Sequence, residues 1–144
     1  MKVQTILAKK GAGVVTIRPE QSVKEAAHLL VEHNIGALVV VNETRQPVGI
    51  ISERDILRAA ALRDNAFAEP VGQVMTKDVI TGMPQDDLIS VAHAMTEKRF
   101  RHLPIMDKGE LVGIISIGDV VKAQRDQYQG EIYTLQTQII GDQS

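Results

Sequence analysis

The sequence contains no cysteine and no tryptophan, and only 3% of its residues are aromatic. Without cysteine, the chain has no disulfide, no thiol nucleophile and no thiolate ligand for a metal. So few aromatic side chains disfavour the base stacking by which single-stranded nucleic acids are bound. No apolar run approaches the ~18 residues that a membrane-spanning helix needs, and the first residues lack the apolar core of a signal peptide. We therefore expect a cytoplasmic protein that does not enter a membrane.

An excess of charge of either sign is also lacking. Lys and Arg number 16 against 18 Asp and Glu, which leaves a net charge of −2. Such a balance gives no reason to expect a nucleic acid or an acidic membrane surface as a partner. A chain of 144 residues, 44% of them hydrophobic, is long enough to bury a core without disulfides or metal ions.

One short segment occurs twice, as VGIISERD at residues 48–55 and as VGIISIGD at residues 112–119. Further identities connect the surrounding residues at an offset of 84 − 19 = 65, which becomes 112 − 48 = 64 after a shorter turn. These identities are Thr16/Thr81, Pro19/Pro84, Ala27/Ala92 and Leu38/Leu103. The pattern indicates a tandem duplication of a β-α-β-β-α unit. Units of about 50 residues are marginal alone, so we expect the two to pack together and share a core.

The boundaries of the units follow from apolar periodicity and turn residues. We expect a lead-in at residues 1–13, a first unit at 14–63, a linker at 64–76, a second unit at 77–129 and a helical tail at 130–144. Strands are expected at 14–17, 35–41, 48–51, 79–81, 103–106 and 111–115. Helices are expected at 22–33 and 55–63, after the cap at Asp87, and from Asp119 to about residue 129.

The repeated motif places a Ser at the end of a strand and an Asp three residues later, where a helix begins. This spacing is typical of a capping box, so the motif has a purely structural explanation. The same turn also suits a ligand, because exposed N–H groups at a helix N-terminus favour anions. An Asp there can accept hydrogen bonds from two vicinal hydroxyls, such as those of a ribose. The two explanations do not exclude each other.

The two motifs resemble the G-h-h-S/T-x-x-D signature of the CBS (cystathionine-β-synthase) domain, and the resemblance covers about residues 14–125. It implies an α/β (α+β) fold in which two CBS units pack as a pseudo-two-fold pair. It also implies clefts that bind AMP, ADP, ATP, and in some members NAD or S-adenosylmethionine. Two such pairs commonly form a flat homodimer.

In the main cleft the resemblance implies that Asp119 holds the ribose, that Ser116 lies on its phosphate side, and that Ile114 packs on adenine. Arg101 and a partly protonated His102 are expected near the phosphate, although a basic helix end also explains them. The full set for this cleft is Ala12, Gly13, Val14, Gly36, Ala37, Arg101, His102, Ile114, Ser116, Gly118 and Asp119. The set for the second cleft is Ile50, Ser52, Arg54, Asp55, Val79 and Ile80. We expect the cleft at Asp119 to be the better nucleotide site.

No sequence feature predicts catalysis. No nucleophile has an evident base and orienting partner, and His28 and His93 lack the further ligands that a metal needs. We therefore predict a regulatory adenine-nucleotide sensor that is not an enzyme, needs no metal, and signals through its homodimer or an unidentified effector protein. Two alternatives remain open: a dimeric CBS scaffold with vestigial clefts, and an enzyme that processes the nucleotide.

Overall fold

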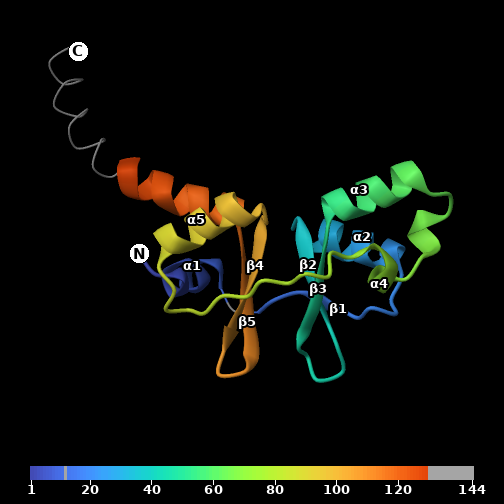
Figure 1. Cartoon of the computed structure of the whole chain (residues 1–144), viewed down its shortest axis with the longest axis horizontal. Helices are drawn as coiled ribbons and strands as arrows, with labels where there is room; N and C mark the ends of the chain where they lie inside the picture. The colour runs from blue at the N-terminus through green and yellow to red at the C-terminus, as the bar shows by residue number, and fades with distance from the viewer. Residues whose placement is uncertain (12, 130–144) are drawn as a thin grey trace, which may run out of the picture.

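The computed structural model describes residues 1–11 and 13–129, so Ala12 and the tail expected as a helix at 130–144 lie outside the described residues. In chain order the elements are α1 (Val3–Lys10), β1 (Thr16–Ile17), α2 (Val23–His33), β2 (Ala37–Val41), β3 (Pro47–Ser52), α3 (Glu53–Leu62), η1 (Ala66–Ala68), α4 (Val71–Val74), α5 (Leu88–Lys98), β4 (His102–Asp107) and β5 (Glu110–Ser116). A last helix begins at Ile117 and is described as far as residue 129. They form a mixed α/β structure of two units side by side (Figure 1).

Helix α2 shows how local sequence sets the elements of the first unit. Ser22 accepts a hydrogen bond from the backbone N–H of Glu25 at 3.1 Å, which begins the helix at the expected residue. The Glu25 carboxylate accepts from Gln21 Nε2 at 2.7 Å, so only half of the expected capping box forms. The helix ends at Asn34, which adopts the left-handed conformation with φ of 52°.

The sheets confirm the duplication. In the first unit β2 pairs with β1 in parallel and with β3 antiparallel, and in the second unit β4 pairs with β5 antiparallel. The register pairs Leu38 with Ile51 in one hairpin and Leu103 with Ile115 in the other, at the repeat offsets. Each hairpin also has an irregularity at the same place, after Val40 and after Ile105. The two hairpins therefore have the same fold.

The strand expected at residues 79–81 is wrong, because only Gly82 forms an isolated bridge to Ile105. Gly82 N–H donates to Pro104 O at 2.9 Å, and Met106 N–H donates to Gly82 O at 2.8 Å. The next rung of a parallel ladder would need an N–H at Pro104 to donate to Ile80 O. Proline has no such N–H, so the ladder stops after one residue.

The lead-in at residues 1–13 contains a helix that the sequence analysis missed. The buried Val3 and Ile6 of α1 pack in the core of the second unit with Leu88, Val91 and Met95. Val71 of α4, which matches Ile6 at the repeat offset of 71 − 65 = 6, packs in the core of the first unit. Each unit is therefore completed by a short helix that immediately precedes the other unit in the chain, and α1 is followed by a crossing to the other unit (Figure 1).

A third apolar cluster lies between the two sheets, as expected for units that share a core. All five residues of β2 are buried, because one face of the strand meets α2 and the other faces the second unit. The cluster consists of Ala37, Val39, Val41, Ile50 and Leu111, with Val14, Met106 and Ile114 packed against it. Among the described residues, no helix has both the length and the apolar character needed to cross a membrane.

Candidate functional site

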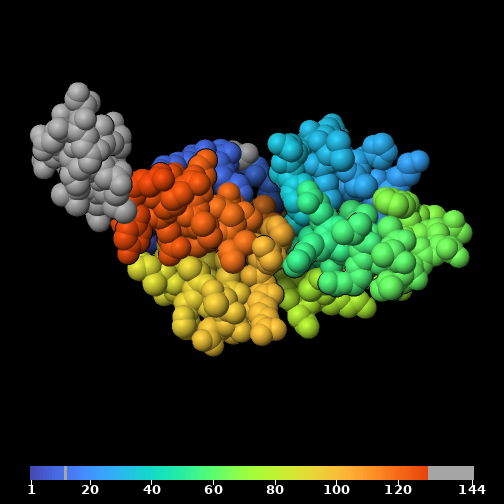
Figure 2. Space-filling model, turned by 90° about the horizontal axis from the view of Figure 1, so that it is seen from above, coloured from blue at the N-terminus to red at the C-terminus, as the bar shows by residue number. Residues whose placement is uncertain are grey.

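A cleft of about 410 Å³ opens between the two units, at the point where β3 ends and α3 begins. Its walls come from four segments: the α2–β2 connection and the β3–α3 turn of the first unit, the linker after α4, and the connection from α5 to β4 in the second unit. Seen from above, the gold segment around residue 100 lies against the green segment that begins α3 (Figure 2). A ligand in this cleft would therefore contact both units.

The turn from Ser52 to Asp55 forms the expected capping box. Asp55 Oδ2 accepts from Ser52 N–H at 2.9 Å and from Ser52 Oγ at 3.1 Å, and Asp55 N–H lies 3.3 Å from Ser52 Oγ. Asp55 Oδ1 takes no part in the box and accepts only from Thr76 Oγ1, at 3.3 Å, among the described residues. The structural explanation of the motif is thus confirmed, and one carboxylate oxygen remains able to accept further hydrogen bonds.

The apolar part of the cleft is formed by Ile50 of β3, by Val79 and Ile80 of the linker, and by Phe100 of the second unit. The linker is held beside β3 by two backbone hydrogen bonds: Thr76 N–H donates to Ile50 O at 2.8 Å, and Ile50 N–H donates to Thr76 O at 2.9 Å. This short bridge explains why residues 79 and 80 reach the cleft although they form no strand. Together these side chains offer an apolar surface to a flat ring.

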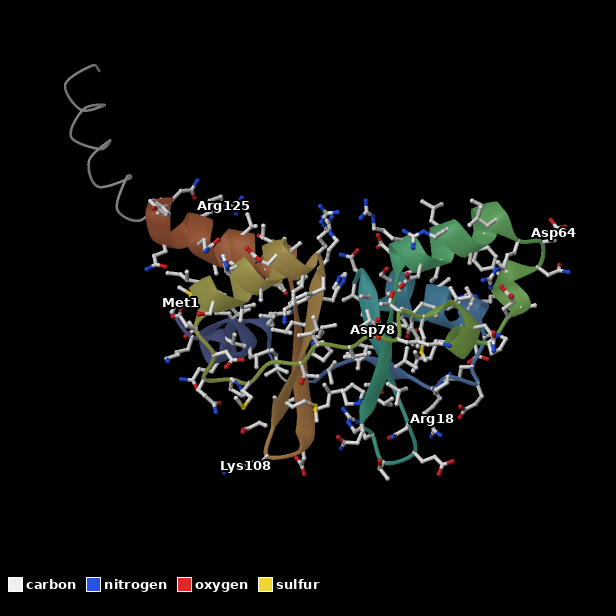
Figure 3. All side chains as sticks on the ribbon, in the orientation of Figure 1. Met1, Arg18, Asp64, Asp78, Lys108 and Arg125 are labelled. Atoms are coloured by element: carbon white, nitrogen blue, oxygen red, sulfur yellow. The ribbon has the colours of Figure 1, made fainter. Side chains whose placement is uncertain are left out.

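Three arginines line the cleft, Arg54 at the start of α3 and Arg99 and Arg101 from the second unit. None of them forms an ion pair within the part of the chain that the structure describes. The carboxylates of Glu53, Asp55 and Asp78 also line the cleft. Figure 3 shows Asp78 where the linker crosses between the units. The net charge of the lining is therefore close to zero, while the planar guanidinium groups remain able to bind an oxyanion bidentately.

His102 lies on the wall of the same cleft, with Nε2 4.0 Å from the position that a Cβ on Gly36 would take. Burial lowers the pKa of His102 below 6.5, and Arg101 and Lys10 act in the same direction against Asp119 and Asp55. Burial and the neighbouring cations thus disfavour the protonated ring, which opposes the partial positive charge expected on His102.

The second motif has the same turn but a different neighbour. Asp119 Oδ2 accepts from Ser116 N–H at 2.8 Å, and Asp119 N–H donates to Ser116 Oγ at 3.1 Å. The ammonium of Lys10 donates to the same Oδ2 at 2.8 Å and to the Ile114 carbonyl oxygen at 2.9 Å. Burial alone would raise the pKa of Asp119, but the hydrogen bonds from Lys10 and Ser116 outweigh it and hold the pKa below its usual value.

The structure brings together every residue expected for the second cleft. The 410 Å³ cleft is lined by Ile50, Ser52, Arg54, Asp55, Val79 and Ile80. Gly36, Arg101 and His102 had been assigned to the cleft at Asp119, and the structure places them on the walls of the Asp55 cleft instead. The reason is that the α5–β4 connection faces the β3–α3 turn across the gap between the units.

The other residues expected around Asp119 are dispersed. Val14, Ala37 and Ile114 belong to the apolar cluster between the sheets, and Gly13 is exposed with φ of 100°. Gly118 lies beside Ser116, and Asp119 lines a separate cavity of about 290 Å³ with Lys10. The stronger binding predicted for the Asp119 cleft stays a prediction.

Several lining residues were not assigned by the sequence analysis. They are Glu53, Thr76, Asp78, Arg99 and Phe100. Arg99 and Phe100 adjoin the assigned Arg101, so the basic run itself was the available signal. Thr76 and Lys10 carry no local signal, because their contacts with the two motifs depend on how the linker and α1 cross between the units.

Comparisons with known proteins agree with this geometry. The family model of the CBS domain matches residues 10–62 and 71–126. The chain is 44% identical over 115 residues to an uncharacterised 17.7 kDa protein of Acidianus ambivalens, covering 78% of this chain and 68% of that protein. It is 35% identical over 111 residues to the CBS domain-containing protein YhcV of Bacillus subtilis, covering 77% and 79%.

Two solved structures are also similar. The CBS-domain containing protein ATU1752 from Agrobacterium tumefaciens superposes with a TM-score of 0.80 at 42% identity, over 86% of this chain and 99% of that one. The CBS domain pair of protein MJ0100 superposes with a TM-score of 0.79 at 30% identity, over 88% and 98%. The MJ0100 structure is a complex with 5′-methylthioadenosine and S-adenosyl-L-methionine.

Proposed function

Since this chain belongs to the CBS-domain family and carries one CBS unit in each half, we propose that it is a regulatory module that senses an adenosine-containing ligand. The ligand binds in the cleft beside Asp55. The observation that supports this most directly is the combination of three features in one cleft of about 410 Å³. These are a carboxylate oxygen outside the capping box, an apolar surface, and three arginines without ion-pair partners among the described residues.

Each feature suits one part of a nucleotide. Asp55 Oδ1 accepts the hydrogen bonds that ribose hydroxyls donate, and Ile50 with Val79 and Ile80 contacts the flat base. The volume is within the ~300–1,000 Å³ of typical small-molecule sites. The complexes of MJ0100 with two adenosine derivatives support adenosine as the common element.

The arginines favour a ligand that carries phosphate. A guanidinium fork binds phosphate oxygens bidentately and with charge assistance. S-adenosylmethionine instead carries a positive sulfonium group and offers the three arginines one carboxylate and no phosphate. We therefore propose AMP, ADP, ATP or NAD as the ligand ahead of S-adenosylmethionine.

The ligand acts by shifting a population of conformations. Its contacts come from both units, so the packing that closes the cleft binds it more tightly than any looser packing does. The altered packing is then passed to an effector protein or across a homodimer of CBS pairs. In this proposal the chain is a binding module, and the groups that line the cleft bind and orient the ligand without transforming it.

Isothermal titration calorimetry with AMP, ATP, NAD and S-adenosylmethionine tests the proposal. Asp55→Asn is the informative variant, because its amide oxygen can still accept from Ser52 N–H while its NH₂ group cannot accept from the ribose. We expect a loss of about tenfold or more in affinity, since hydrogen bonds to a charged group contribute about 1.5–3 kcal/mol each. The control is Asp64→Asn, an Asp outside the cleft lining that Figure 3 shows beyond the end of α3.

The outcomes separate the proposed function from its alternatives. If none of the four ligands binds more tightly than about 1 mM, near −4 kcal/mol, the proposal fails and a scaffold with vestigial clefts is favoured. If a nucleotide is converted to product during the titration, as detected by chromatography, the chain is an enzyme. Equal affinities of Asp55→Asn and Asp64→Asn would exclude Asp55 as the ribose ligand.

A further inference from the structure

The two repeated motifs differ in the group that occupies their acceptor oxygens. In the first unit, the Ile50 carbonyl accepts from the Thr76 backbone at 2.8 Å, and Asp55 Oδ1 accepts from the Thr76 hydroxyl at 3.3 Å. In the second unit, the Lys10 ammonium donates to the repeat-equivalent Ile114 carbonyl at 2.9 Å and to Asp119 Oδ2, the oxygen that also accepts from Ser116 N–H, at 2.8 Å. A charged side chain from the start of the chain thus binds the carbonyl that forms a backbone bridge in the other unit, and it also pairs with the carboxylate of the motif.

The position of Lys10 is fixed by helix α1. Val3 and Ile6 are buried in the core of the second unit, and Leu7 packs against Gly113 of the motif strand. Lys10 is in the last turn of α1, which ends at Gly11 with φ of 86°. The helix therefore presents the ammonium at the motif turn, where Asp119 is partly buried with 24% of its side chain exposed.

We propose that Lys10 masks a second adenosine site at Asp119. This inference rests on the proposed function, because it assumes that the repeated motif binds ribose in both units. The Lys10 ammonium pairs with Asp119 through Oδ2 and so offsets the charge of the whole carboxylate, which weakens Oδ1 as an acceptor for ribose hydroxyls. A nucleotide therefore binds tightly at this site only when Lys10 leaves. The site at Asp119 is then the weaker of the two, which reverses the order predicted from the sequence.

The repeat itself supplies the substitution that tests the mask. At the offset of 75 − 65 = 10, Lys10 corresponds to Met75, so Lys10→Met installs the residue that the other unit has at this turn. Lys10 is 38% exposed on its side chain, and the substitution removes no buried contact of α1. Lys2→Met is the control, because Lys2 has the same charge at the start of α1, does not line the cavity at Asp119 and forms no ion pair with the described residues.

Binding of AMP is measured by calorimetry in the Asp55→Asn background, which removes the first ribose ligand and leaves the site at Asp119. We expect Lys10→Met to tighten AMP binding about three- to tenfold, since a partly buried ion pair no longer competes. Lys2→Met should leave the affinity unchanged, and adding Asp119→Asn should abolish the gain. An unchanged or weaker affinity in Lys10→Met overturns the proposal, and a weaker one would make Lys10 a phosphate ligand instead.

The same titrations on the otherwise wild-type chain separate this inference from the proposed function. If wild type and Lys10→Met each bind one equivalent of AMP, masking by Lys10 is overturned while the proposed sensing function still stands. If wild type does not bind AMP, Lys10→Met does, and Asp119→Asn abolishes that binding, the result supports masking by Lys10 and refutes the Asp55 site. No binding by either protein overturns both.

A ligand-free measurement also tests the contact. Carboxyl-carbon NMR follows the titration of Asp119, whose pKa should rise in Lys10→Met and stay unchanged in Lys2→Met. An unchanged titration in Lys10→Met would show that Lys10 does not hold Asp119 in solution and would overturn the proposal.

Discussion

Replacing Gly49 by alanine should destabilise the protein more than the same replacement at Gly113, although both glycines have the same place in the repeated motif. A Cβ on Gly49 would overlap Met75 Sδ and would lie 3.0 Å from the carbonyl oxygen of Thr76. At Gly113 the nearest obstacle is Leu7 Cδ2 at 2.6 Å, the end of a flexible side chain. At both glycines another segment of the protein approaches the strand closely, residues 75 and 76 at Gly49 and Leu7 at Gly113.

The two replacements should differ in their effect on the free energy of unfolding because different atoms must move to make room for the new Cβ. The Thr76 carbonyl is held by the two backbone hydrogen bonds to Ile50, at 2.8 and 2.9 Å, so it cannot retreat without stretching this bridge. Overpacking costs ~1–3 kcal/mol, while the reduced freedom of the unfolded chain returns ~0.4–1 kcal/mol. We expect Gly49→Ala to lower the free energy of unfolding by about 1–2 kcal/mol. Leu7 can rotate away, so Gly113→Ala should stay within about 1 kcal/mol of wild type.

Urea denaturation of both variants measures these free energies, provided that the m-values agree with wild type. In thermal melts the same loss should appear as roughly 2–4 °C per kcal/mol for a chain of this size. Met75→Ala in the Gly49→Ala background should restore only part of the stability, because the Thr76 carbonyl remains. Equal losses in the two glycine variants, or a larger loss at Gly113, would refute the reasoning.

Two further predictions concern the cleft. Because burial lowers the pKa of His102 below 6.5, its contribution to stability should be complete above about pH 6.5 and lost as the pH falls towards the folded pKa. His102→Gln should flatten this part of a stability curve recorded by urea denaturation, and an unchanged slope would contradict it. Gly36→Leu should weaken AMP binding about tenfold or more while the melting temperature stays within about 2 °C, because a Cβ there meets its nearest neighbour at 3.9 Å. Lost stability with intact binding would contradict this second prediction.

Much of the fold could be predicted from the chain alone, because its signals are local or repeated. The VGIIS strands, their Ser and Asp caps and the equivalent hairpins follow from composition and periodicity within a few residues. The strand expected at 79–81 was wrong for a reason outside its own segment. Its ladder depends on a partner at Pro104, which has no N–H to donate.

The candidate site, like the fold, could be predicted from the sequence only in part. The residues of the Asp55 turn, with Val79 and Ile80, were found from the motif and its repeat, since each lies at a position that the duplication defines. Sequence alone thus determined that the chain holds two CBS units, each with a turn built for capping and suited to a ligand. Only the tertiary structure decided that α1 packs in the second unit and places Lys10 on Asp119, and that Arg101 and His102 face the Asp55 cleft. Those contacts depend on how the connecting segments cross between the units, and no spacing along the chain encodes which residues a crossing brings together.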